Sequence, residues 1–86
     1  MTEELIGKVS HWFGKIGVAG IELIGTLAVG DRIHILGHTT DFEQNITSMQ
    51  IMHQDVSEAG PGDNVGLKVK FRARPGDNVY KIASTE

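Results

Sequence analysis

Short runs of alternating apolar and polar residues, separated by glycine-containing turns, limit the folds open to this chain more than any other feature. Eleven residues are glycine and only two are proline. The run LKVKFRAR at residues 67–74 shows the alternation most clearly, since four basic residues oppose Leu67, Val69, Phe71 and Ala73. Because successive side chains of a strand point to opposite faces, this period of two predicts half-buried strands and an all-β fold.

The turns between these runs are chemically explicit, because the pentapeptide PGDNV occurs twice, at residues 61–65 and 75–79. Proline fixes φ at the first central position of a type II turn, and glycine supplies the positive φ that the second position needs. The aspartates that follow, Asp63 and Asp77, can accept hydrogen bonds from nearby backbone amides. The sequence VGD at residues 29–31 predicts a related turn without the proline.

Turn signals recur at roughly the 8–12-residue spacing of a sandwich or barrel. We therefore expect a small closed antiparallel six-stranded β-barrel in which residues 1–86 form a single domain, with a core of about 5–82 and short flexible termini. The apolar parity changes within the fourth expected strand, so a bulge near residues 47–48 should bend it and turn Gln50 and Met52 outward. The expected strands lie near 5–13, 16–23, 31–37, 42–53, 64–74 and 77–82.

The length and composition fit one globular domain with a modest core. Eighty-six residues are too few for a Rossmann enzyme or a barrel of alternating strands and helices. Hydrophobic residues make up 40% and charged residues 22%, which is not the composition of a disordered chain. The side chains expected to face the interior are Val9, Ile33, Ile35, Ile46, Ile51, Val65, Leu67, Val69 and Phe71.

Cysteine is absent, which excludes disulfides, a thiol nucleophile and cysteine-ligated metal sites. The first residues, MTEELIGKVS, begin with two glutamates and no basic region, so we expect no secretory signal. No apolar stretch approaches the ~20 residues that a bilayer span requires. These features predict a cytoplasmic protein that does not contact a membrane.

The order of the motifs resembles a known family. Residues 25–37 (GTLAVGDRIHILG), 46–51 (ITSMQI) and 59–66 (AGPGDNVG) are similar to the second, β-barrel domain of elongation factor Tu and related translational GTPases. Residues 5–82 as a whole are similar to small stand-alone proteins described as translation elongation factor-like. The resemblance implies the same barrel and a translation-related function, namely association with RNA, tRNA or the ribosome.

GTP hydrolysis does not follow from this resemblance. The glycines of GKIGVAG, Gly14, Gly17 and Gly20, are not followed by the Lys-Ser or Lys-Thr pair of a phosphate-binding loop. No serine stands in a G-x-S-x-G nucleophile elbow. We therefore expect a chain that is not an enzyme, holds no cofactor and binds no nucleotide.

One cluster of charge is a candidate RNA-binding site: Lys68, Lys70, Arg72 and Arg74. On one strand face these four side chains span ~20 Å, which is long enough to track several nucleotides of single-stranded RNA. The alternative is a solvated exterior that is balanced by acids on neighbouring strands, since the net charge of the chain is −3. The candidate balancing acids are Glu22, Glu43 and Asp55.

The segment GHTTDF and its histidines offer a second surface. His38, Thr39, Thr40 and Asp41 form a candidate interaction loop, although they also suit a turn held by side-chain-to-backbone bonds. His34 and His38 are four residues apart, or ~13 Å along a strand, which is too far for one metal ion. We expect neutral surface histidines here and no metal site.

Two function classes follow from these observations. The first is an RNA- or ribosome-associated binding module, which the family resemblance favours. The second is a protein-interaction barrel that docks onto a separately encoded enzyme.

Overall fold

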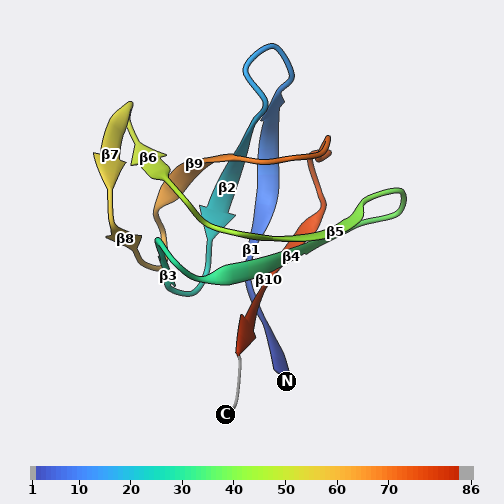
Figure 1. Cartoon of the computed structure of the whole chain (residues 1–86), viewed down its shortest axis with the longest axis horizontal. Coiled ribbons are helices and arrows are strands. Elements are labelled where there is room, and N and C mark those ends of the chain that lie inside the picture. Colours follow the sequence, from blue (N-terminus) through green and yellow to red (C-terminus); the bar gives the residue numbers. More distant parts are fainter. Residues whose placement is uncertain (1, 84–86) are drawn as a thin grey trace.

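The computed structural model describes residues 2–83, and within that range the chain forms ten strands and no helix (Figure 1). The all-β prediction is therefore confirmed, and these residues include no helix that could cross a membrane. Of the expected flexible termini, residues 1 and 84–86 lie outside the described range, whereas residues 2–4 belong to β1 and residue 83 to β10. The strands are β1 (Thr2–Phe13), β2 (Val18–Leu23), β3 (Leu27–Ala28), β4 (Arg32–Leu36), β5 (Asp41–Asn45), β6 (Met49–Ile51), β7 (Gln54–Val56), β8 (Glu58–Ala59), β9 (Asn64–Lys68) and β10 (Asn78–Ala83).

Eight strands form one antiparallel sheet in the order β5-β4-β10-β1-β2-β9-β6-β7, and β3 pairs with β8 in a second sheet. The register of β1 shifts between Leu5 and Gly7, where it pairs with β10, and between Val9 and His11, where it pairs with β2. Bulges of this kind bend a strand and increase its twist. In Figure 1, β4 and β5 run across the direction of β1 and β2, so the sheet curls around one core.

Most of the predicted core lies inside this curl. The buried members are Val9, Ile33, Ile35, Ile46, Val65, Leu67 and Val69. Ile51 is half-buried and packs against the others. Phe71 is 61% exposed, so its predicted place in the core is wrong.

Phe71 lies outside because the strand that was predicted to contain it ends early. β9 ends at Lys68. From there the backbone of Lys68 and Lys70 is hydrogen-bonded by the buried side chain of Gln44, on β5, in place of a strand backbone. The Gln44 amide donates a 2.9 Å hydrogen bond to the Lys68 carbonyl and accepts one of 2.9 Å from the Lys70 N–H. The ladder ends there, and the Phe71 ring packs edge-on against Phe42 at 5.3 Å between centroids.

The closed six-stranded barrel is not confirmed. Within residues 2–83 neither sheet closes on itself, because the Gln44 side chain and not a backbone ladder joins β5 to the segment after β9. The expected strand 42–53 is divided into β5 and β6 instead of being bulged. Ile46 follows the last residue of β5 and hydrogen-bonds the turn before β4. Its N–H donates to the Asp31 carbonyl, and its carbonyl accepts from the Gly30 N–H.

The predicted turns are confirmed at three places. The central glycines are Gly30, Gly62 and Gly76, with φ of 101°, 90° and 97°. In each turn an aspartate carboxylate accepts a 2.9 Å hydrogen bond from the backbone N–H three residues earlier, in the pairs Asp31–Ala28, Asp63–Gly60 and Asp77–Arg74. The VGD turn therefore has the bonding of the two PGDNV turns.

Candidate functional site

An apolar groove of about 540 Å³ lies on the outer face of the sheet, over β1, β2, β9 and β6. Its lining includes three strongly exposed apolar side chains, Phe13, Ile16 and Met52, with exposed fractions of 49%, 61% and 88%. The His11 ring extends this surface, because it stacks on Phe13 at 6.0 Å between centroids. Single exposed apolar side chains are ordinary, whereas several around one hollow mark an interaction surface.

Two glycines keep the groove open. Gly20 on β2 and Gly66 on β9 are directly paired in the sheet. A Cβ atom on Gly20 would lie 3.3 Å from the Cβ of His11, and one on Gly66 would lie 3.3 Å from Cγ1 of Val18. Larger residues at these two positions would fill the hollow.

The hairpin between β6 and β7 has an unusual backbone at the rim of the groove. Its two central residues, Met52 and His53, have φ of 51° and 65°, and Ile51 pairs with Gln54 across the turn. Positive φ at both positions is typical of a two-residue type I′ hairpin turn, which favours Asn-Gly. Non-glycine residues are strained in this conformation, and the Met52 side chain lies in solvent beside the groove.

A serine and a histidine meet inside the groove. The Oγ atom of Ser10 lies 3.2 Å from Nδ1 of His11, and the Ser10 hydroxyl donates to the Gly20 carbonyl at 3.3 Å. Within the described residues, no carboxylate hydrogen-bonds His11 to orient it. The pair therefore lacks the third member of a Ser-His-Asp triad.

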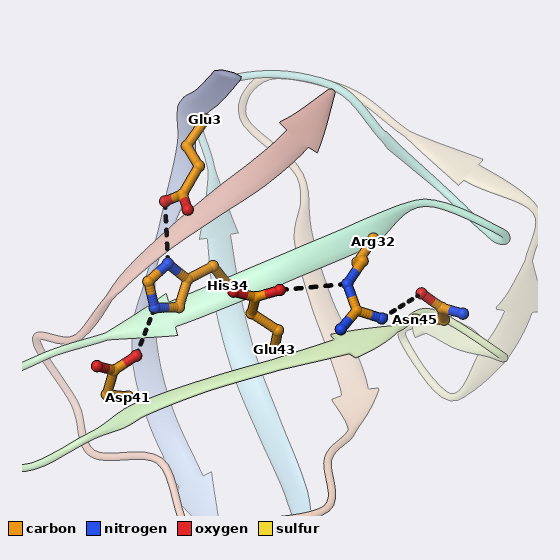
Figure 2. Close-up of polar contacts among 6 residues, drawn as sticks. All are labelled: Glu3, Arg32, His34, Asp41, Glu43 and Asn45. Carbon is orange, nitrogen blue, oxygen red and sulfur yellow. Dashed lines mark hydrogen bonds and ion pairs between the residues drawn. The ribbon is translucent and has the colours of Figure 1, made fainter. Parts of the chain in front are cut away.

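A histidine–carboxylate cluster lies elsewhere on the sheet (Figure 2). His34 of β4 lies between two acids: its Nδ1 is 2.9 Å from Oε1 of Glu3, and its Nε2 is 2.6 Å from Oδ1 of Asp41. Glu43, directly opposite His34 on β5, pairs with Arg32 at 3.3 Å. The His34 side chain is only 13% exposed, so these contacts are partly shielded from water.

The two acids raise the pKa of His34 above its ordinary value of 6.5. The hydrogen bond to Glu3 has the largest effect and that to Asp41 the next, and together they outweigh burial, which lowers the pKa. A charged imidazole donates from both nitrogens and satisfies both carboxylates. The raised pKa of His34 favours its charged form. This was not anticipated from the sequence, because Glu3 lies 31 residues away along the chain.

The four candidate RNA-binding side chains were predicted to lie on one strand face, but they do not. Lys68 ends β9, while Lys70, Arg72 and Arg74 lie in the irregular segment before β10. All four are exposed, and the described residues include no ion pair to any of them. The proposed balancing acid Glu43 pairs with Arg32 instead.

The candidate interaction loop connects β4 to β5. His38 and Thr39 are exposed, whereas Thr40 is buried and its carbonyl accepts a 2.7 Å hydrogen bond from the Gly37 N–H. Asp41 is the first residue of β5, and its carboxylate bonds His34 and not the turn backbone. A role for this loop in recognition stays a prediction.

The strands define a small all-β domain with an apolar groove on its outer face. The family model for elongation factor Tu domain 2 matches residues 18–80, so the chain belongs to that family. Among solved structures, it is similar to the C-terminal domain of a U32 peptidase from Geobacillus thermoleovorans, with a TM-score of 0.87, 23% identity and 93% of each chain covered. The resemblance noted from the motifs is thereby confirmed.

The curated relatives are proteases. The chain is 44% identical over 81 residues to an uncharacterized protease of Methanocaldococcus jannaschii, covering 93% of this chain and 20% of that protein. It is 34% identical over 83 residues to a collagenase of Porphyromonas gingivalis, covering 94% of this chain and 23% of that protein. The chain thus spans about a fifth of the length of the curated relatives it matches.

These relatives overturn the translation-related function. The family resemblance identifies the fold correctly. The relatives described above are, however, named as a protease and a collagenase, and the similar solved structure is a domain of a U32 peptidase. The prediction of RNA, tRNA or ribosome association in translation is therefore wrong.

Sequence reasoning also missed the groove and the histidine–carboxylate cluster. A signal for the groove was present: Phe13 and Ile16 are apolar residues on either side of the short connection between the expected strands 5–13 and 16–23, where polar residues are usual. The cluster had no comparable signal, because Glu3 and His34 are 31 residues apart and meet only through sheet pairing.

Proposed function

We propose that this chain is a non-catalytic accessory domain of a U32-type peptidase and packs against the catalytic part of that enzyme through the apolar groove. The observation that carries the proposal is the likeness to a U32 peptidase C-terminal domain over 93% of both chains. The relatives named protease and collagenase support it, because each has about four-fifths of its length outside the matched region.

The groove is the surface best suited to that contact. Exposed fractions of 61% for Ile16 and 88% for Met52 leave apolar area that a partner can cover. Burying one isoleucine side chain stabilises a complex by about 1.5–3 kcal/mol. Since each 1.4 kcal/mol corresponds to a tenfold change in affinity, a single truncation in the groove should be measurable.

The test uses this chain and the catalytic region of a U32 peptidase from the same organism, mixed and examined by sedimentation velocity. We expect a complex that the Ile16→Ser variant weakens at least tenfold. Ile24→Ser is the matched control, because Ile24 is also an isoleucine with 61% exposure but does not line the groove. Failure of the wild-type chain to bind, or equal weakening by both variants, would contradict the proposal.

A second measurement tests the non-catalytic assignment. The isolated chain should leave fluorescein-labelled gelatin uncut, because the Ser10–His11 pair has no orienting carboxylate among residues 2–83. Cleavage that disappears in the Ser10→Ala variant would instead assign catalysis to the groove.

A further inference from the structure

The histidine–carboxylate cluster has the donor set of a zinc site. Glu3, His34 and Glu43 each offer one ligand atom, and these three atoms lie within 4.8 Å of one another. They come from β1, β4 and β5, so three strands hold them. One imidazole nitrogen with two carboxylate oxygens suits Zn²⁺, whereas Ca²⁺ and Mg²⁺ prefer oxygen ligands alone.

The ligand atoms of His34 and Glu3 need little adjustment for a metal ion. Nδ1 of His34 and Oε1 of Glu3 are 2.9 Å apart. Ligand atoms of a tetrahedral zinc ion, with bonds of about 2.0–2.1 Å, lie roughly 3.3 Å apart. A shift of a few tenths of an ångström would therefore admit the ion between these two atoms.

Asp41 orients the histidine for this role. Its carboxylate accepts from Nε2 of His34 at 2.6 Å, which holds the ring with Nδ1 directed at Glu3 (Figure 2). Metal-binding histidines usually donate their second ring N–H to a carboxylate in this way. The Tyr80 ring, centred 6.2 Å from the His34 ring, and the low exposure of His34 give the site one partly shielded wall.

The local charge also matches a divalent cation. Glu3, Asp41 and Glu43 carry three negative charges, and Arg32, bonded to Glu43, carries one positive charge. With a neutral imidazole, the cluster thus has two negative charges in excess. Arg32 can keep its bond to the Glu43 carboxylate while a second oxygen of that group faces the ion.

We propose that Glu3, His34 and Glu43 bind one Zn²⁺ ion, with Asp41 as the positioning residue for His34. Zinc replaces the Nδ1 proton and joins the first strand of the chain to the β4–β5 hairpin. This site is separate from the apolar groove and does not depend on the peptidase-associated function.

The test is calorimetric titration of the tag-free, metal-free chain with ZnCl₂. We expect a stoichiometry of one, loss of at least a hundredfold in affinity in His34→Gln, and a 10- to 100-fold loss in Asp41→Asn. His38→Gln is the matched control, because it removes an exposed histidine of the same hairpin outside the ligand set. Circular dichroism of each variant establishes that it is folded.

Three results would overturn the proposal. The first is absence of zinc binding to the folded wild-type chain. The second is equal affinity in His34→Gln and His38→Gln, which would place the ion elsewhere. The third is equal affinity for Ca²⁺ and Zn²⁺, which would mean that the carboxylates attract cations without using the imidazole.

Discussion

The strained turn at the rim of the groove gives a prediction that links stability to binding. Replacing Met52–His53 with Asn-Gly supplies the residues that a type I′ turn favours. Relief of the left-handed conformation should stabilise the chain by about 1 kcal/mol per residue, and the entropy of the new glycine should cost about 0.5–1 kcal/mol. Little packing is lost, because Met52 is 88% exposed. The expected net gain is about 1 kcal/mol.

For a domain of this size, that gain corresponds to a rise in Tm of roughly 4–8 °C. Thermal unfolding followed by circular dichroism measures it, with Met52→Ala/His53→Ala as the control that removes the same side chains and keeps positive φ. Both double variants should bind the peptidase catalytic region more weakly than the wild type. A Tm for the Asn-Gly variant no higher than that of the alanine variant would refute the idea that this turn stores strain.

Three further predictions concern the rest of the fold. Gln44→Leu should destabilise the chain by about 2–4 kcal/mol in urea unfolding, because it removes the hydrogen-bond partner of the Lys68 carbonyl and of the Lys70 N–H. An unfolding midpoint like that of the wild type would contradict this role of Gln44. Asp77→Ala should lower the free energy of unfolding by about 1.5–3 kcal/mol, measured in the same way. Asp63→Ala should lower it by less, since Asp77 is the more buried of the two turn aspartates. A larger loss in Asp63→Ala would show that burial does not set the difference. In chelator-treated buffer, the raised pKa of His34 stabilises the fold fully below pH 6.5, and this contribution is lost as the pH rises through the folded-state value. Urea midpoints measured from about pH 6 to pH 9 should therefore fall more in the wild type than in His34→Gln, and parallel curves would contradict the ion pairs.

The fold class, the turns and most of the core follow from local patterns in the sequence. The alternation of apolar and polar residues predicts that Ile33, Ile35 and Leu67 face the core, and all three are buried. Successive side chains of a strand point to opposite faces, so this prediction needs only the positions of neighbouring residues. The three aspartate turns were equally local, since the glycine and the aspartate act within four residues. Each of these features needs only neighbouring residues.

The point where the alternation stops and the side chains that meet across strands depend instead on the packing of the whole chain. Gln44 ends the ladder of β9 from a strand more than twenty residues away, and this turned Phe71 outward. Glu3 reaches His34 only because β10 lies between β1 and β4 in the sheet. Gly20 and Gly66 form the floor of the groove only because β2 pairs with β9 in one register. These contacts depend on the order and register of strands, which the pairing of the whole chain sets and no local pattern encodes.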